Sequence, residues 1–168
     1  MIIGFVGLIG SGKDTAAQIL VNEFNFQRES FAGPLKDVLS AVFGWNRLLL
    51  EGTDPYARHW REQPDEWWSA RLNMEVTPRN MMQMWGTDVV RNHFNTDTWI
   101  ASLENRLQKS TNNIVISDAR FPNEIESIQK AGGYIIRVKR GPDPEWWDNA
   151  VLTASTTKES EYIIYDNG

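Results

Sequence analysis

The stretch Gly-Leu-Ile-Gly-Ser-Gly-Lys-Asp-Thr at residues 7–15 constrains this chain more than any other. It matches the pattern Gly-x-x-x-x-Gly-Lys, in which glycines allow a tight curl whose N–H groups hold phosphate oxygens. Lys13 adds a positive charge to the curl. The pattern expects Ser or Thr directly after the lysine, as a contact for Mg²⁺, but Asp14 stands there and Thr15 follows. The stretch predicts a phosphate-binding loop, with Gly10, Ser11, Gly12, Lys13, Asp14 and Thr15 as its nucleotide-binding residues.

The segments on either side of this loop support that interpretation. Residues 2–6 are a short apolar run that includes β-branched residues, which is typical of a strand buried on both faces. After the loop, Ala17, Leu20, Val21 and Phe24 recur at the spacing of a core-facing helix. A strand, a glycine loop and a helix are the context that a phosphate-binding loop needs, because the helix adds the positive end of its dipole.

Composition excludes several classes of protein. A chain of 168 residues with 41% hydrophobic residues is long enough for one domain with a real core. It has no apolar run near 18 residues and no recognisable secretion signal, so we expect neither a membrane partner nor export. It contains no cysteine, which fits a reducing cytoplasm, and its net charge of −5 argues against direct nucleic-acid binding.

Apolar periodicity and breakers predict alternating strands and helices. We expect strands at 27–31, 113–118, 134–138 and 162–165, and helices at 34–43, 77–94, 96–109 and from 122 to Gly132-Gly133. Val38 and Val42 are expected on the inner face of the helix at 34–43, and Val89 on the inner face of the helix at 77–94. Residues 44–76 are expected to form an irregular insertion packed by tryptophans, and residues 141–159 a mobile loop.

Positive charge that a phosphate ligand would need is concentrated in the middle of the chain. Five arginines and no lysine lie between residues 58 and 91. Arginine binds phosphate through a planar fork of two hydrogen bonds, although any one of these arginines could equally be an ordinary surface residue. The helix at 77–94 also carries a ridge of hydrogen-bonding groups spaced by four, within which Gly86 predicts a close approach. The candidates that we select for substrate binding are Lys36, Arg71, Arg79, Gln83, Asp88 and Arg91.

The strand expected at 113–118 ends in a carboxylate. Asp118 at the carboxyl end of a strand beside the loop strand is the position of a Walker-B residue, which holds Mg²⁺ or its water. Arg120 follows two residues later, where it would offset charge in a transition state. The expected catalytic residues are therefore Lys13, Asp14, Asp118 and Arg120, and the expected metal ligands are Asp14, Thr15 and Asp118. Neither His59 nor His93 has the spacing of a metal site.

Four separated blocks resemble the deoxynucleoside monophosphate kinases of tailed bacteriophages. They are the loop at 7–15, Ser-Phe-Ala-Gly-Pro-Leu-Lys at 30–36, Thr-Pro-Arg-Asn-Met-Met-Gln-Met-Trp-Gly-Thr-Asp-Val-Val-Arg at 77–91 and Ser-Asp-Ala-Arg-Phe-Pro-Asn-Glu at 117–124. The resemblance extends from Met1 to about Arg140, and Gly-Lys-Asp-Thr is this group's version of the loop. Relatives usually continue beyond the last expected strand, so adenine contacts there would be reduced or rebuilt.

The resemblance implies a fold, a reaction and its reactants. It implies an α/β fold of the P-loop, adenylate-kinase-like type, with a central parallel sheet flanked by helices. The chain would be a single domain over 1–168, with a core at 1–43 and 95–168 and a helical acceptor-binding insertion at about 44–94. The implied cofactors are ATP and Mg²⁺, and the partner is a deoxynucleoside monophosphate. A homodimer is left open, and the compartment would be the cytoplasm, that of the host if the chain is phage-encoded.

Two other functions remain as alternatives. One is another small-molecule P-loop kinase, such as one acting on dephospho-coenzyme A or phosphomevalonate. The other is a P-loop ATPase that acts as a switch on a partner, although the guanine-reading motif Asn-Lys-x-Asp is missing. The sequence does not indicate which bases are accepted, or whether modified pyrimidines are used.

Overall fold

The computed structural model describes residues 1–8 and 10–141, and these residues group into two compact units. One unit, here called the sheet unit, contains Met1–Phe31 and the chain from Ile100 onward. The other, here called the helical unit, contains Ala32–Trp99. The strand expected at 162–165 and nearly all of the loop expected at 141–159 lie outside the described residues. No helix in the described part of the chain is long and apolar enough to cross a membrane.

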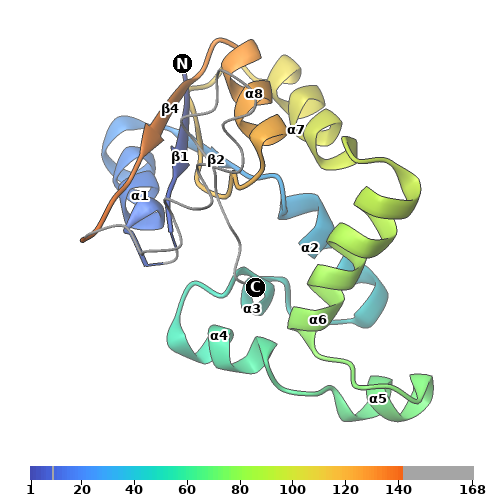
Figure 1. The fold of residues 1–168 in the computed structure, drawn as a ribbon. Helices are drawn as coiled ribbons and strands as arrows, with labels where there is room; N and C mark the ends of the chain where they lie inside the picture. Colours follow the sequence, from blue (N-terminus) through green and yellow to red (C-terminus); the bar gives the residue numbers. More distant parts are fainter. Residues whose placement is uncertain (9, 142–168) are drawn as a thin grey trace. The chain divides into compact units, whose positions relative to one another are not determined.

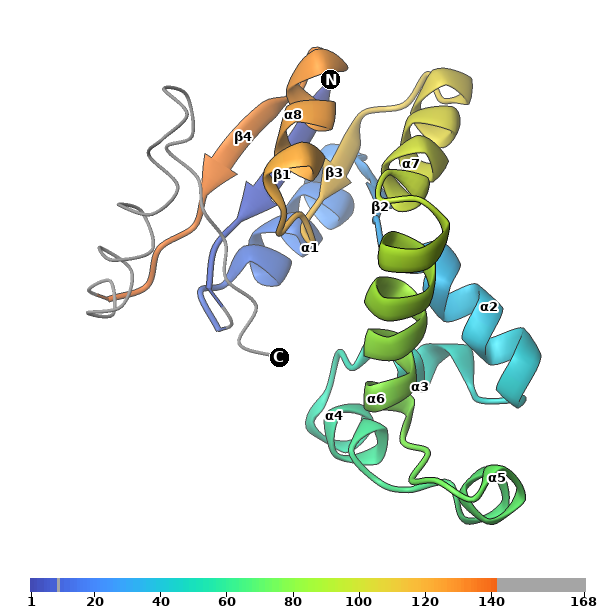
Figure 2. The ribbon, with the colours of Figure 1, turned by 45° about the vertical axis from the view of Figure 1, so that its right-hand side comes forward.

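The sheet unit is built on four parallel strands in the order β2-β3-β1-β4 (Figures 1 and 2). This confirms the predicted α/β class with a central parallel sheet. The strands β1 and β3 are short and almost wholly apolar, as strands covered on both faces are. The strands are β1 (Ile2–Val6), β2 (Gln27–Glu29), β3 (Ile114–Ile116) and β4 (Tyr134–Arg137).

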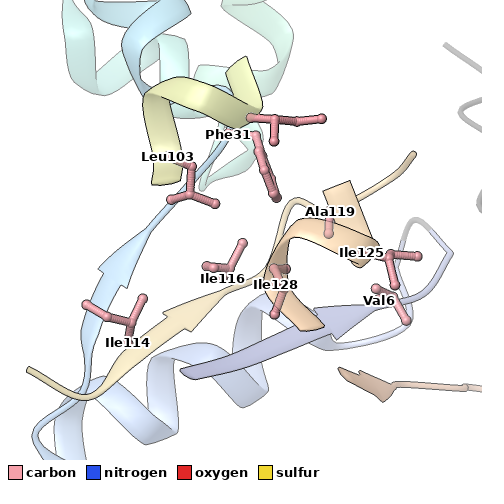
Figure 3. Close-up of a cluster of buried hydrophobic side chains, with 9 residues drawn as sticks. Val6, Phe31, Leu103, Ile114, Ile116, Ala119, Ile125 and Ile128 are labelled. Atoms are coloured by element: carbon pink, nitrogen blue, oxygen red, sulfur yellow. The ribbon is translucent and has the colours of Figure 1, made fainter. Parts of the chain in front are cut away.

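Helices cover both faces of this sheet, with α1 (Lys13–Phe24) and α8 (Pro122–Lys130) on opposite sides of β1 in Figure 1. Side chains alternate along β3, so Val115 packs with α1 while Ile114 and Ile116 pack toward α8 and α7 (Thr98–Lys109). Figure 3 shows the cluster of buried side chains that contains Ile116 and Ile128. The sheet is thereby held rigidly on both sides.

The helical unit begins with α2 (Gly33–Phe43) and continues through three short helices. These are α3 (Arg47–Glu51), α4 (Pro55–Arg61) and α5 (Glu66–Leu72). The expectation that residues 44–76 are irregular was therefore wrong, whereas the helical insertion that the resemblance implies within 44–94 is present. Helices of five to seven residues are too short to show a periodic pattern, but each begins at a side chain that caps it, namely Asn46, Asp54 and Asp65.

The long helix expected at 77–94 is present, but it changes its winding. Thr77 caps α6 (Pro78–Gln83), and the chain then continues as a π-helix, η1 (Met84–Phe94). A π-helix has hydrogen bonds five residues apart, and Asn95 N donates to Val90 O at 2.8 Å in this way. At Gly86, a Cβ would stand 2.8 Å from Leu35 Cδ2, so the predicted close approach is to α2.

A mixed apolar and aromatic core fills the helical unit. Phe43 stacks on Trp45 with ring centroids 4.3 Å apart and meets Trp68 edge-on at 4.9 Å. The tryptophans thus mainly pack this unit, as expected, although Trp67 is 63% exposed. The predicted inward positions Phe24, Val38, Val42 and Val89 were wrong, because all four side chains are exposed. Periodicity gave these helices too broad an apolar face.

Candidate functional site

The loop after β1 has the geometry that its glycines predict. Gly10 and Gly12 take φ values of 78° and 99°, which residues with a Cβ adopt only under strain. Ser11 N donates to Leu8 O at 3.1 Å, which closes the curl, and α1 begins directly afterwards at Lys13. The Lys13 ammonium lies over the loop, with Nζ 3.5 Å from Leu8 O. Main-chain amides, a helix N-terminus and a lysine therefore converge there.

Two features of the loop fit a bound phosphate. Ser11 Oγ is buried and has no hydrogen-bond partner among the described residues, which is costly for a hydroxyl unless a ligand supplies one. A Cβ built on Gly10 or Gly12 would meet no atom of the described residues within 4 Å, so there is open space beside both glycines. Gly7 is the opposite case, because a Cβ there would stand 2.4 Å from Val138 O. The loop is thus anchored at Gly7 and accessible at Gly10 and Gly12.

Asp14 has a protein partner that the sequence did not reveal. Its Oδ1 accepts from Arg28 Nη2 at 2.6 Å and from Ser117 Oγ at 2.8 Å, and Arg28 Nη2 also lies 2.7 Å from Ser117 Oγ. Arg28 belongs to β2 and Ser117 follows β3, so this triangle joins three elements of the sheet unit. It compensates the carboxylate that would otherwise stand uncompensated beside a phosphate site.

The segment after β3 places the predicted Asp118 and Arg120 next to this triangle in the chain. Asp118 Oδ1 accepts from Phe31 N at 3.1 Å. The carboxylate of Glu124, which is only 2% exposed, accepts from Arg120 N at 2.8 Å and from Phe121 N at 3.2 Å. Glu124 was quoted in the sequence motif without a role, and it fixes the turn that carries Arg120.

The predicted metal ligands make up only part of the set of ligands that a metal ion needs. Asp14 and Asp118 both lie at the carboxyl edge of the sheet, because Asp14 bonds to Ser117, the neighbour of Asp118. Thr15 is exposed in the first turn of α1. In residues 1–8 and 10–141 no three His, Cys, Asp or Glu side chains gather as metal ligands. These donors suit an ion that takes its remaining ligands from phosphate and water.

In the helical unit, the predicted Lys36 lies in a network of ion pairs. Lys36 Nζ lies 2.6 Å from Glu51 Oε2, and Arg47 bridges Glu51 to Asp37, with 2.5 Å between Arg47 Nε and Asp37 Oδ1. Burial alone would raise the pKa of Glu51, but the hydrogen bonds and charges of Lys36 and Arg47 outweigh it and lower the pKa. Burial would likewise lower the pKa of Arg47, and Asp37 and Glu51 instead raise it. The charge of Lys36 is therefore compensated within the unit.

The other predicted substrate residues are distributed over α5, α6 and η1. Arg79 Nε lies 2.8 Å from Glu62 Oε1, and Arg71 is exposed in the last turn of α5. Gln83 and Asp88 are exposed, while Arg91 is half-buried and has partners. Sequence reasoning passed over Arg61, whose Nε is buried without a hydrogen bond in the described chain. A partly buried arginine is not distinguishable from an exposed one in the sequence alone.

Comparison with known proteins supports the kinase family that the sequence resembles. A family model described as "Deoxynucleotide monophosphate kinase" matches residues 61–168, a range that begins well after the phosphate-binding loop. A protein of Acanthamoeba polyphaga mimivirus, named "Putative deoxynucleotide monophosphate kinase", is 34% identical over an alignment of 154 residues that covers 83% of this chain and 74% of its own. The "Deoxynucleoside-5'-monophosphate kinase" of Escherichia phage T5 is 22% identical over an alignment of 180 residues that covers 77% of this chain and 72% of its own.

Proposed function

Because this chain belongs to the deoxynucleotide monophosphate kinase family, we propose that it transfers the γ-phosphoryl group of ATP to a deoxynucleoside 5′-monophosphate. The products are ADP and a deoxynucleoside diphosphate. The observation that carries the proposal is the loop at residues 7–15, where the open curl and the orphaned Ser11 hydroxyl fit a bound phosphate. Phosphoryl transfer depends mainly on positioning and charge neutralisation, which such a loop provides.

On the donor side, we assign binding to the loop and stabilisation to two cations. The amides of residues 10–13 and the Lys13 ammonium would bind phosphate oxygens, and the buried Ser11 hydroxyl would gain a partner. Arg120, on the turn fixed by Glu124, would neutralise charge on the transferring group. ATP supplies the phosphoryl group, and bound Mg²⁺ supplies charge neutralisation.

For Mg²⁺ we propose Thr15 and Asp118 as direct or water-mediated ligands. Asp14 would act through water, because its Oδ1 already accepts hydrogen bonds from Arg28 and Ser117. An ion held by so few protein oxygens keeps several waters, as Mg²⁺ usually does. With Thr15 as the hydroxyl ligand and Asp14 acting through water, a carboxylate can stand at the position where the usual pattern has a hydroxyl.

On the acceptor side, we assign the nucleotide to the helical unit. Its 5′-phosphate would be bound by guanidinium groups, which match phosphate bidentately. Gln83 and Asp88, both exposed on the α6–η1 helix, would contact or brace the nucleotide. The proposed phosphate-binding residues are Lys36, Arg71, Arg79 and Arg91. No observation favours a dephospho-coenzyme A or phosphomevalonate kinase, or an ATPase switch.

A coupled ADP-release assay tests the proposal. With ATP and Mg²⁺, we expect at least one of dAMP, dGMP, dCMP and dTMP to raise the rate of ADP release tenfold or more above that with ATP alone. The ribose counterparts, dephospho-coenzyme A and phosphomevalonate serve as rival acceptors. Acceleration by a rival but by none of the four deoxynucleotides would contradict the proposal, and so would rapid ATP hydrolysis that no acceptor changes.

A further inference from the structure

Arg61 occupies an unusual position at the end of α4. Its guanidinium lies directly against Gly52, where a Cβ would stand 2.2 Å from Arg61 Cζ. Gly52 also has a φ of 64°, so a side chain at this position would be both strained and in collision. Arg61 Nε is buried and has no hydrogen-bond partner among the described residues. The helical unit thus keeps room for this guanidinium without supplying an acceptor for it.

The charged groups that surround Arg61 do not compensate it. Burial and then the positive charge of Arg79 lower the pKa of Arg61, and Arg58 acts in the same direction. Glu62 and Glu51 oppose this shift but do not outweigh it. The electrostatic environment of Arg61 is therefore positive on balance.

Both of those carboxylates are engaged by other cations. Glu62 Oε1 pairs with Arg79 Nε at 2.8 Å. Glu51 Oε2 pairs with Lys36 Nζ at 2.6 Å, and Glu51 Oε1 pairs with Arg47. Arg61 makes no ion pair within the part of the chain that the structure describes. Among these four cations, it is the one for which the described residues provide no anion.

An uncompensated, partly buried cation costs free energy of folding, and replacing such a group by an apolar one is often neutral or stabilising. A guanidinium held in this way is therefore suited to an anion that arrives from solution. A phosphate monoester is the anion that matches its planar fork, and nearby positive charge strengthens the attraction for a dianion.

We propose that Arg61 is a phosphate-binding residue of the helical unit and that its ligand is the 5′-phosphate monoester of the acceptor. This inference rests on the proposed function, which names the acceptor as a nucleoside monophosphate. It adds Arg61 to the acceptor residues and distinguishes it from Arg79. Arg79 already has a protein carboxylate, whereas Arg61 gains its first anion when the acceptor binds.

The test compares Arg61→Met with Arg58→Met in the full chain. Arg58 is an exposed arginine of the same helix whose Nη1 contacts the backbone carbonyls of Gly52 and Thr53, so it controls for loss of one charge. We expect Arg61→Met to raise the KM for the accepted deoxynucleotide about 10- to 100-fold, from the loss of charge-assisted hydrogen bonds. The KM for ATP should stay within twofold, and Arg58→Met should change the deoxynucleotide KM less than threefold. Arg61→Lys should fall between wild type and Arg61→Met.

Thermal unfolding separates binding from a structural role. If Arg61 has no anion partner until the acceptor binds, Arg61→Met should unfold at the same temperature as wild type or at a higher one. A lower Tm with an unchanged deoxynucleotide KM would overturn the inference, as would no change in either quantity. The proposed function would survive both results, because wild type would still phosphorylate the acceptor.

A readout that does not need turnover covers failure of the proposed function itself. If wild type phosphorylates none of the four deoxynucleotides, inorganic phosphate serves as the probe in a background of Lys13→Met, which weakens the loop. Phosphate should then raise the Tm of Lys13→Met and of Lys13→Met/Arg58→Met, but not of Lys13→Met/Arg61→Met. Equal stabilisation of all three by phosphate would overturn the inference about Arg61.

Discussion

The loop at residues 10–13 and the arginines of the helical unit both offer positive charge, but they hold it in different ways. In the loop, the charge belongs to main-chain amides and Lys13, and glycine geometry fixes its direction. In the helical unit, it belongs to long side chains, and neighbouring carboxylates decide which of them are compensated. Lys36 and Arg79 have carboxylate partners, whereas Arg61 has none in the described chain. A backbone site can be recognised from local sequence, whereas a side-chain site depends on contacts between distant residues.

The largest effect should come from removing the positively charged side chain of the loop, Lys13. Lys13→Met should lower kcat about 10²- to 10³-fold, because a positioned cation at the developing charge is lost. Binding of the deoxynucleotide, measured by calorimetry without ATP, should stay within threefold of wild type if the two regions are separate. Lys109→Met, at the exposed end of α7, is the matched control and should leave kcat unchanged. A loss of kcat below tenfold would remove Lys13 from the proposed mechanism.

The next effect separates the anchored part of the loop from its open part. Gly7→Ala would place a Cβ 2.4 Å from Val138 O, so we expect it to lower the free energy of unfolding by about 3 kcal/mol. The Cβ of Gly10→Ala would meet no atom of residues 1–8 and 10–141 within 4 Å, so this variant should cost about 1 kcal/mol, from its positive φ alone. Urea denaturation of both variants measures the difference. Equal losses would show that the loop relaxes freely around Gly7.

The same contrast explains how far the sequence could predict the molecule. The loop and the helix that begins after residue 77 follow from local patterns, the parallel sheet follows from the family resemblance, and the structure has all three. Phe24 and Val89 were assigned inward because helical spacing cannot tell how wide a buried face is. The short helices α3 to α5 were missed because they complete too few turns to show periodicity.

The candidate site was predictable only where it is local. Asp14 and Ser117 are 103 residues apart in the chain and Arg28 lies 14 residues from Asp14, so no spacing rule joins the three. Burial of Arg61 and the engagement of Lys36 by Glu51 likewise emerge only from folding. Sequence identified which residue types could bind phosphate, and the tertiary contacts distinguish paired cations such as Lys36 and Arg79 from Arg61, which has no ion pair among the described residues.

A smaller effect tests whether Arg28 makes Asp14 compatible with the loop. Arg28→Gln should raise the KM for ATP about 5- to 10-fold, because the freed carboxylate repels the triphosphate through partly screened charge. The double variant Asp14→Asn/Arg28→Gln should recover most of that loss, and the KM for the deoxynucleotide should not move. Tm should change little, because the pair is largely exposed. If the single and double variants have the same KM for ATP, the pairing has no electrostatic role.

The smallest effect concerns Glu51, which organises the compensated side of the helical unit. The pKa of Glu51 is lowered from the ordinary value of 4.5. Its ionised form therefore stabilises the fold at pH values above the pKa that this carboxyl group has in the unfolded chain. That stabilisation should be lost as pH falls through the still lower pKa of the folded state.

At pH 7, Glu51→Gln should cost about 1 kcal/mol of unfolding free energy, after allowance for its partial exposure. The difference from wild type should shrink steadily below pH 4.5 in urea titrations, because protonation removes the same charge that the substitution removes. Glu23→Gln, which alters an exposed acid of α1, is the matched control and should leave the free energy of unfolding at pH 7 unchanged. A constant difference across this range would mean that Glu51 acts through packing, and that Lys36 is compensated by something other than its charge.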